Sequence, residues 1–359
     1  MSKILILANN DMGLYKFRKD LIKELLRNNE VYISLPKGEL VQPLIDEGCH
    51  FIDTDVDRRG INPITDSFLL LRYVKIIKEV NPDLIITYTI KPNIYGSLVA
   101  RLYKKKYAVN ITGLGTAFQN DNILRKFIIF LYKMALKKAH VAFFENEGNR
   151  NVFIEEKIVD KDRTVRLNGA GVDLEEYSFE EYPSEDENIR FLFIGRIMKE
   201  KGIDEFLFAA KQVKNEYPDV QFDVIGPMED DYKDVIDNYV SHNYINYYGY
   251  QSDVKPFIKQ CHCFVLPSYH EGMANTLLES ASMGRPLITT DIHGCKEAIA
   301  HNGYLVKVKD STDLYKKMID FINLPYESQK QLGMNSRKHM EEVFDKKKVV
   351  KATMEGLDI

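Results

Sequence analysis

The chain has 359 residues, of which 45% are hydrophobic and 28% charged, with a formal net charge of −4. This length exceeds one typical hydrophobic core and suits two domains, and the nearly balanced charge gives no indication of a nucleic-acid partner, so none is expected. The sequence contains four cysteines: Cys49, Cys261, Cys263 and Cys295. They do not have the spacing of zinc ligands and are too few for a disulfide framework, which favours reduced thiols in the cytoplasm.

The amino-terminal stretch MSKILILANN has the pattern of a β-strand. It lacks the long apolar segment and small-residue cleavage site of a signal peptide. No apolar run approaches the roughly 18 residues that a membrane-spanning helix requires. We therefore expect a protein that is neither secreted nor integral to a membrane.

Short β-branched runs then alternate with longer segments of helical period. The first series is KILILA, YKFRKDLIKELLR, EVYISL, ELVQPLIDEG, HFIDTDV, SFLLLRYVKIIKEV, DLIITYT, IYGSLVARLYKKK and YAVNIT. A second series begins with IRFLFIGR at 189–196 and continues through IDEFLFAAKQV, VQFDVIG, CFVLPS, NTLLESASMG and PLITT. Because parallel strands need crossover helices, this alternation predicts an α/β fold of two doubly wound, Rossmann-like domains.

The segment SFEEYPSEDEN at 178–188 is polar, acidic and contains a proline, as a linker does. We therefore predict an N-terminal domain over 1–180 and a C-terminal domain over 181–340. The terminal helix, 341–359, is a candidate to pack back on the first domain. Ligands of open parallel sheets bind outside the carboxyl ends of the strands, so two such domains are expected to face a central cleft.

The motif GRIMKEKG follows the strand RFLFIG and contains Gly195, Arg196, Lys201 and Gly202. Glycine permits a tight exit from the strand. An arginine and a lysine at this strand end suit a diphosphate, one as a planar fork and one as a point charge. Cations at the start of a helix oppose its dipole, which favours a nearby anion. A solvated basic helix start is the alternative.

The stretch HEGMANTLLE at 270–279 holds two glutamates, Glu271 and Glu279. Eight residues of helix would separate them by about 12 Å, which does not fit the carboxylate pair of a retaining glycosidase, about 5 Å apart. Asn275 is a good N-cap candidate. Free amides near that helix start would then suit a phosphate: Met273, Ala274, Asn275 and Thr276.

GRIMKEKG followed by SYHEGMANTLLESASMGRPLI closely resembles retaining glycosyltransferase family 4, which has the GT-B fold. The family hallmark is a glutamate, seven residues and a second glutamate, matched by Glu271 and Glu279. In the first domain, TIKPNIYGSLVA and NITGLGTAF look like bacterial transferases that extend polyprenyl-diphosphate-linked saccharides for capsule, O-antigen or protein glycosylation.

The resemblance implies a metal-free reaction that retains the anomeric configuration and uses a nucleotide sugar, with UDP as the expected nucleotide. Arg196 and Lys201 would hold the donor diphosphate and stabilise its charge as the nucleotide leaves. Glu271 would contact the donor sugar and Glu279 the ribose hydroxyls. The glycines and amides of the donor site would be Gly13, Gly195, Gly272, Met273, Ala274, Asn275 and Thr276.

The acceptor side is less well marked. Many family members have a histidine where this chain has Thr112. Basic and polar residues in first-domain loops, Arg58, Arg59, Lys91 and Asn93, are candidates to bind the acceptor, with exposed loop cations as the alternative.

The basic amphipathic segment 123–140 suits an anionic membrane surface or, equally, a core-facing helix with a solvated face. These features predict a cytoplasmic enzyme at the inner face of the plasma membrane.

Other patterns have more ordinary interpretations. DTDVD at 53–57 resembles a manganese-binding DxD motif, but the GT-B interpretation makes a metal site unnecessary. Cys261 and Cys263 are expected to be buried thiols. His270 lines the site or serves packing. A nucleotide-sugar 2-epimerase of the same fold, or a non-catalytic nucleotide-sugar-binding subunit, is the alternative function.

Overall fold

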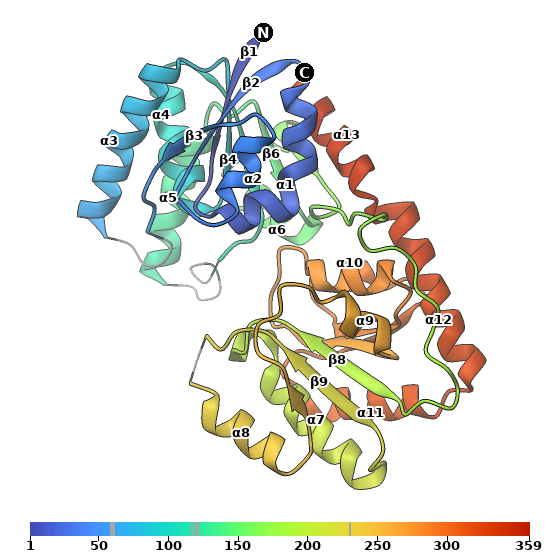
Figure 1. Cartoon of the computed structure of the whole chain (residues 1–359). Coiled ribbons are helices and arrows are strands. Elements are labelled where there is room, and N and C mark those ends of the chain that lie inside the picture. The colour runs from blue at the N-terminus through green and yellow to red at the C-terminus, as the bar shows by residue number, and fades with distance from the viewer. Residues whose placement is uncertain (58–61, 116–117, 119–121, 230) are drawn as a thin grey trace. The chain divides into compact units, whose positions relative to one another are not determined.

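The computed structural model describes the whole chain except residues 58–61, 116–117, 119–121 and 230 (Figure 1). It divides into two compact units: unit 1 is Met1–Ala170 with Lys347–Ile359, and unit 2 is Gly171–Lys346. Unit 2 thus begins before the boundary expected at 180/181. The reason is a backbone pairing, because Val172 donates to the carbonyl of Phe344 at 2.8 Å and accepts from Lys346 at 3.0 Å.

Unit 1 is a seven-stranded parallel sheet in the order β3-β2-β1-β4-β5-β6-β7. Its elements are β1 Ser2–Leu7, α1 Asp11–Leu26, β2 Asn29–Leu35, α2 Val41–Asp46, β3 His50–Asp53, α3 Pro63–Val80, β4 Leu84–Tyr88, the π-helix η1 Pro92–Gly96, α4 Ser97–Leu102, β5 Lys106–Ile111, α5 Ile123–Leu136, β6 Val141–Phe144, α6 Glu147–Glu155, the 3-10 turn η3 Lys161–Arg163, β7 Thr164–Arg166 and, near the C-terminus, α13 Lys346–Leu357.

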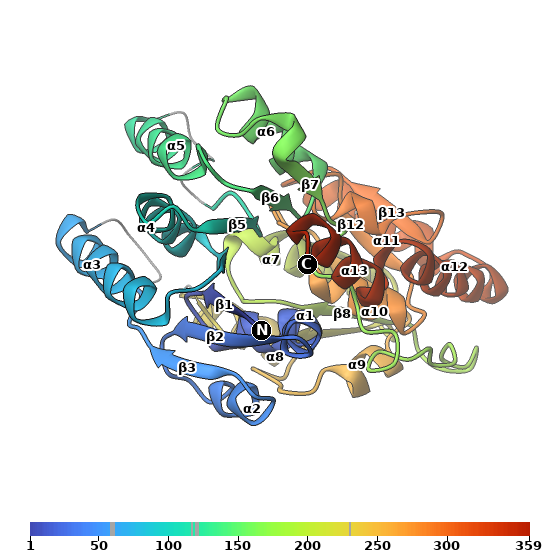
Figure 2. The same cartoon turned by 90° about the horizontal axis from the view of Figure 1, so that it is seen from above.

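Helices cover both faces of this sheet, as the alternating sequence pattern predicts (Figure 2). All five residues of β4 are buried, because a strand in the middle of a parallel sheet has no solvent-facing side. One face packs on α3, α4, α5 and α6, and the other on α1 and α13. The strand order reverses between β1 and β4, where ligands of such sheets bind.

Unit 2 is a six-stranded parallel sheet in the order β10-β9-β8-β11-β12-β13. Its elements are β8 Arg190–Ile194, η4 Lys199–Lys201, α7 Ile203–Glu216, β9 Gln221–Ile225, α8 Lys233–Ser241, β10 Asn246–Tyr247, α9 Lys255–Gln260, β11 Cys263–Leu266, α10 Asn275–Ser282, β12 Leu287–Thr290, η5 Lys296–Ala298, β13 Gly303–Val306, α11 Ser311–Ile322, α12 Tyr326–His339 and η6 Met340–Phe344. Here the order reverses between β8 and β11.

The last residues, 347–359, return to unit 1. Val349 and Leu357 of α13 are buried in the same core as α1. Lys106 donates its ammonium to the carbonyl of Leu357 at 2.6 Å. Gly356 lies so close to the sheet that a Cβ atom there would stand 2.7 Å from the Phe143 ring. Helix α13 is therefore an integral part of the unit 1 core.

The four cysteines are buried free thiols, which confirms the expectation for Cys261 and Cys263. Among the described residues, the helices are too short or too polar for any of them to cross a membrane.

Candidate functional site

Three glycines bring neighbouring strand ends of unit 2 together. Gly195 follows β8, and Gly226, with a φ of 144°, follows β9. A Cβ atom on Gly226 would lie 1.8 Å from the carbonyl oxygen of Gly195, so a side chain does not fit there. Gly226 also donates its N–H to the carbonyl of Gly249, after β10, at 2.8 Å. The three strand ends therefore pack backbone against backbone at the edge where such sheets bind ligands.

Lys201 and Glu271 are brought together by a fourth glycine. Gly202 has a φ of 74°, and a Cβ atom there would lie 2.1 Å from the carbonyl oxygen of Pro267. This contact holds η4 against the end of β11. The Lys201 ammonium forms an ion pair with Oε1 of Glu271, and the Ser268 hydroxyl donates to the same oxygen at 2.8 Å. Both bonds end on Oε1, so within the described chain Oε2 is the oxygen left for a ligand.

Arg196 is much more open than Lys201. Its side chain is 48% exposed, and its guanidinium lies 3.5 Å from the Glu229 carboxylate. A loose, solvated pair of this kind contributes little to stability. Arg196 can therefore turn to an incoming anion at low cost, whereas Lys201 would have to be shared between that anion and Glu271.

Helix α10 begins at Asn275 with Ala274 as its N-cap, so the prediction that Asn275 caps this helix is wrong. The Ala274 amide is also not free, because it donates to the carbonyl of Gly294 at 2.9 Å. Gly294, with a φ of 89°, in turn packs against the backbone of Gly272. The amides of Asn275 and Thr276 lie in the first turn, where N–H groups have no partner inside the helix. The buried Oδ1 of Asn275 has no hydrogen-bond partner among the described residues.

Glu279 lies on α10 and faces Tyr177, from the segment that precedes β8. Burial raises the pKa of Tyr177, and the charge of Glu279 and a hydrogen bond to it raise the pKa further. The phenol therefore stays protonated and donates to the carboxylate. Ser282 donates its hydroxyl to the Tyr177 carbonyl at 2.6 Å, which fixes the tyrosine against α10. Glu279 is thus a positioned side chain and not a freely solvated one.

Two further residues complete this part of the site. Burial lowers the pKa of His270, with Glu271 acting in the opposite direction, so the imidazole is mainly neutral at pH 7. The Met273 side chain is only 6% exposed and packs into the core of unit 2. Any contact of Met273 with a ligand is therefore through its backbone.

In unit 1, Gly13 lies in the first turn of α1, and its amide donates to Oδ1 of the N-cap Asn10 at 2.6 Å. At the end of β4, Thr89 has a φ of 72°, which is rare for a β-branched residue and marks strain. Next to it, the Arg18 guanidinium lies over the Tyr88 ring and pairs with the Glu145 carboxylate at 2.5 Å. These groups gather near the reversal of strand order between β1 and β4.

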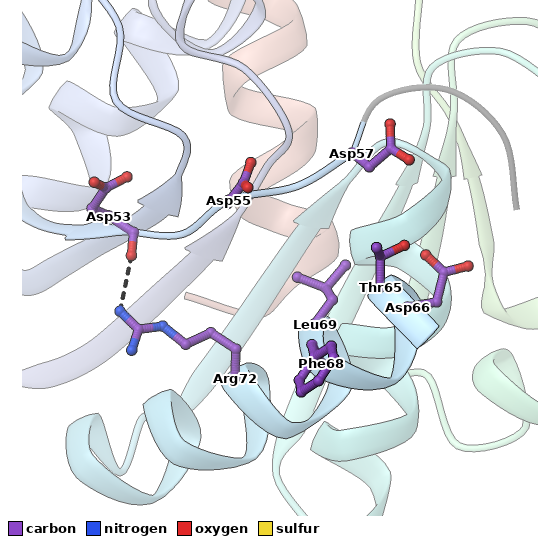
Figure 3. A pocket seen from close by; sticks show the side chains of 8 residues that line it. All are labelled: Asp53, Asp55, Asp57, Thr65, Asp66, Phe68, Leu69 and Arg72. Atoms are coloured by element: carbon purple, nitrogen blue, oxygen red, sulfur yellow. Dashed lines mark hydrogen bonds between the residues drawn. The ribbon is translucent and has the colours of Figure 1, made fainter. Parts of the chain in front are cut away.

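The DTDVD stretch lines a hollow of about 610 Å³ between the segment that follows β3 and helix α3 (Figure 3). Arg72 of α3 donates to the carbonyl of Asp53 at 3.0 Å, as the dashed line in Figure 3 marks. The hollow is lined by Asp53, Asp55, Asp57, Thr65, Asp66, Phe68, Leu69 and Arg72. Within the described residues, no group of three or more acidic, histidine or cysteine side chains has a geometry that could hold a metal ion.

The predicted acceptor residues differ in placement. Lys91 pairs with Asp66 at 2.8 Å and lies 3.7 Å from Asp57, so an acceptor would have to compete with two carboxylates. Asn93 is only 1% exposed; it donates to the carbonyl of Asn110 and accepts from Thr87. Both polar atoms of the Asn93 side chain are therefore held by the protein, and its role in acceptor binding stays a prediction. Arg58 and Arg59 lie outside the described residues.

Sequence reasoning missed Ser268, Tyr177 and Glu229. No sequence spacing links Tyr177 to Glu279, because the two residues are about a hundred positions apart in the chain. One signal was present: Ser268 stands three residues before Glu271, a distance that a hydroxyl can bridge in a tight loop.

Residues 175–339 match the sequence model "Glycosyl transferases group 1" and residues 3–146 match "Glycosyl transferase 4-like". A Campylobacter jejuni N,N'-diacetylbacillosaminyl-diphospho-undecaprenol alpha-1,3-N-acetylgalactosaminyltransferase is 29% identical over 336 residues, 88% of each chain. An Escherichia coli UDP-Gal:alpha-D-GlcNAc-diphosphoundecaprenol alpha-1,3-galactosyltransferase is 28% identical over 321 residues, 80% of this chain and 79% of the relative.

Among solved structures, Anabaena HepE in complex with UDP and glucose superposes with a TM-score of 0.82 at 16% identity and covers 100% of both chains. The two parallel sheets and this likeness show the GT-B fold. Each half of the chain thus matches a glycosyltransferase family model, which confirms the resemblance drawn from Glu271, Glu279 and the GRIMKEKG motif.

Proposed function

We propose that the enzyme transfers a hexose or N-acetylhexosamine from a nucleotide sugar, most simply a UDP-sugar, to a lipid-linked saccharide, with retention of configuration. The proposed binding of the nucleotide-sugar donor rests on the arrangement of Arg196, Lys201 and Glu271 at the carboxyl ends of β8 and β11. Two cations and a carboxylate with one open oxygen stand together at the ligand-binding edge of unit 2.

Each group has a distinct task in this proposal. Arg196 and Lys201 stabilise the negative charge that develops on the diphosphate as the bond to the sugar breaks. Oε2 of Glu271 accepts a hydrogen bond from a sugar hydroxyl. Glu279, held by Tyr177, accepts from the ribose. The acceptor hydroxyl then attacks the same face of the sugar that the diphosphate leaves.

The two cations supply the charge that a divalent ion provides in other transferases, so the proposed reaction needs no metal. A transfer assay in the presence of EDTA tests this directly. We expect full activity there, and activity that returns only on adding Mg²⁺ or Mn²⁺ would contradict it.

The acceptor half rests on the relatives. Two of them act on saccharides linked to undecaprenyl diphosphate, by their names, and a third is a capsular polysaccharide biosynthesis glycosyltransferase of Staphylococcus aureus, 22% identical over 334 residues. We therefore propose a polyprenyl-diphosphate-linked acceptor, used in the assembly of a bacterial surface polysaccharide or glycan.

A panel of nucleotide sugars tests the donor half. A ligand that binds only the folded protein raises its melting temperature by mass action, so we expect at least one UDP-sugar to do so. The Arg196→Ala and Lys201→Ala variants should lose most of this shift. No shift with any UDP-, GDP- or ADP-linked sugar would contradict the proposal.

Incubation with a UDP-sugar alone distinguishes the alternative activity. A transferase leaves the sugar unchanged, apart from slow hydrolysis, until an acceptor is added. A 2-epimerase would give an epimerised product without acceptor, and a non-catalytic subunit would give no product in either case.

We further propose that unit 1 docks on the inner face of the plasma membrane. Helix α5 exposes large apolar side chains, with Ile123 87%, Phe127 45% and Phe130 55% exposed. Helix α3 covers the same face of the sheet as α5 (Figure 2). It exposes further apolar side chains, at Ile64, Phe68 and Leu71. Exposed lysines stand on α5, at Lys126 and Lys133, and directly after it, at Lys137 and Lys138. Apolar insertion together with attraction to anionic lipid is how amphipathic helices bind membranes.

A further inference from the structure

Helix α7 begins directly after η4 and carries a buried carboxylate in its first turn. Glu205 is only 7% exposed, and a buried carboxylate destabilises a fold unless hydrogen bonds or positive charge compensate for the lost water. Both of its oxygens accept from the Tyr269 hydroxyl, at 2.9 Å and 3.1 Å, and the N-terminal end of the helix dipole favours its negative charge. The Glu205 carboxylate is therefore held at a fixed position.

Tyr269 stands in the loop that follows β11, two residues before Glu271. Its amide donates to the carbonyl of Glu200 in η4 at 2.9 Å. Burial raises the pKa of Tyr269, and the hydrogen bond to Glu205 raises the pKa further, so the phenol stays protonated and donates. Tyr269 is thus bound twice, through its backbone to η4 and through its side chain to α7.

The same segments carry the two groups that pair in the proposed donor site. Lys201 is the last residue of η4, and its ammonium forms the ion pair with Glu271 in the loop. The two bonds of Tyr269 therefore fix the loop of Glu271 relative to the segment of Lys201. On its other side the loop is held by Thr290 of β12, whose hydroxyl donates to the carbonyl of Ser268 at 2.5 Å.

We propose that Glu205 and Tyr269 are positioning residues for the transfer reaction, which keep the Glu271 carboxylate at the place and angle that the donor sugar requires. This inference rests on the proposed function, because both residues act through Glu271. A displacement of about 1 Å in an active site can cost about 10²-fold in rate, so the loop that carries Glu271 has to be held precisely. A hydrogen bond to a charged acceptor is strong and directional, and apolar packing alone is not directional.

Tyr269→Phe tests the proposal, because it removes one oxygen atom and keeps the ring. We expect kcat to fall about 10- to 100-fold. The KM for the donor should stay within about threefold of the wild type, because the misplaced contact is one that strengthens in the transition state. The assay uses the UDP-sugar that raises the melting temperature most, with an undecaprenyl-diphosphate-linked N-acetylhexosamine as acceptor, and kcat is expressed per folded molecule.

A double-mutant cycle separates positioning from a general loss of stability. If Tyr269 acts through Glu271, then adding Tyr269→Phe to Glu271→Gln should lower kcat by less than about a further twofold. Fully additive losses would overturn the proposal. Glu205→Gln keeps an oxygen that accepts from the phenol and should retain about five- to tenfold more activity than Glu205→Leu. Equal losses in these two variants would overturn the proposal as well.

The matched control is Tyr315→Phe. Tyr315 lies on α11 and donates its hydroxyl to Glu216, which is the last residue of the same helix α7. This variant removes the same kind of bond at the far end of α7, so it should leave kcat and KM unchanged.

The outcomes distinguish a failure of this inference from a failure of the proposed function. A wild-type kcat in Tyr269→Phe, beside a large loss in Glu271→Gln, would overturn the positioning role and leave the donor site as proposed. A wild-type kcat in Glu271→Gln would overturn the role of Glu271 and the positioning role together. If the wild-type protein transfers no sugar from any UDP-, GDP- or ADP-sugar, the proposed function fails and the positioning role fails with it.

Discussion

At Glu271 a single carboxylate oxygen receives both the Lys201 ammonium and the Ser268 hydroxyl. Removing the charge but keeping the shape, in Glu271→Gln, should lower kcat about 10²- to 10³-fold, which is the usual cost of losing one electrostatic contact to a transition state. Steady-state kinetics with a UDP-sugar and a lipid-linked acceptor measures this. A melting temperature close to that of the wild type shows that the fold persists.

Ser268→Ala is the companion variant. It removes one of the two bonds that orient the carboxylate and leaves the ion pair with Lys201. We expect a smaller loss of activity than in Glu271→Gln. Turnover of Glu271→Gln at the wild-type rate would show that the carboxylate has no role in the reaction.

His262 gives the protein a pH-dependent stability. It is 2% exposed and accepts a hydrogen bond from the Arg190 amide through Nδ1 at 3.2 Å. Burial lowers the pKa of His262 to about 4, from 6.5. Between these values the unfolded chain binds a proton that the folded protein does not, so the free energy of unfolding rises with pH. Stability is therefore complete above about pH 6.5 and is lost progressively as the pH falls toward 4.

Urea unfolding at several pH values between 4 and 7 measures this dependence. A single such group contributes a slope of up to about 1.4 kcal/mol per pH unit. Carboxylates also titrate in this range, so the informative quantity is the difference between the wild type and His262→Gln. The variant should show a shallower slope, and identical slopes would contradict the prediction.

At the scale of single elements, α5 carries the membrane proposal. Phe127→Ser with Phe130→Ser should reduce sedimentation with vesicles of phosphatidylglycerol, because two apolar side chains then no longer insert into the lipid. The UDP-sugar affinity should be unchanged, since Arg196, Lys201 and Glu271 lie in unit 2. Binding should also weaken with salt and in pure phosphatidylcholine, because the lysines lose their attraction.

Val240→Ser on α8 is a suitable control, because Val240 is 40% exposed in the other unit. If the double variant of α5 binds anionic vesicles as well as this control does, then α5 is not the docking helix.

The elements themselves were largely predictable from sequence, and the exact end of one was not. Runs such as DLIITYT and RFLFIG were expected as strands and form β4 and β8, because buried parallel strands are continuously apolar. The N-terminus of α10 was misplaced by one residue because Gly294, from a distant loop, takes the Ala274 amide. Local propensity favours asparagine as a cap, and a tertiary contact overrode it.

In the candidate site, the charged residues were predictable from a motif, whereas their partners were not. Arg196, Lys201 and Glu271 stand in recognisable local patterns. Tyr177, Glu229 and Gly249 reach the site only through the packing of segments far apart in sequence. Asn93 likewise donates to the carbonyl of Asn110 on β5, and no local sequence pattern predicts this hydrogen bond.

At the scale of the whole molecule, α13 ties the last residues to unit 1. Leu357 is fully buried, so Leu357→Ala should lower the free energy of unfolding of unit 1 by about 2–5 kcal/mol. Hydrogen exchange should become faster in β5 and β6 and stay unchanged in β8 and β9. The control is Ile359→Ala, since Ile359 is 50% exposed, and equal exchange in both variants would contradict the packing role.

The return of residues 347–359 to unit 1 has a consequence for synthesis on the ribosome. Unit 2 is one continuous stretch, Gly171–Lys346, and all of it is synthesised before the rest of α13. Until α13 is present, the apolar surface of unit 1 that packs on Val349 and Leu357 stays exposed. The unit encoded first is therefore the one completed last.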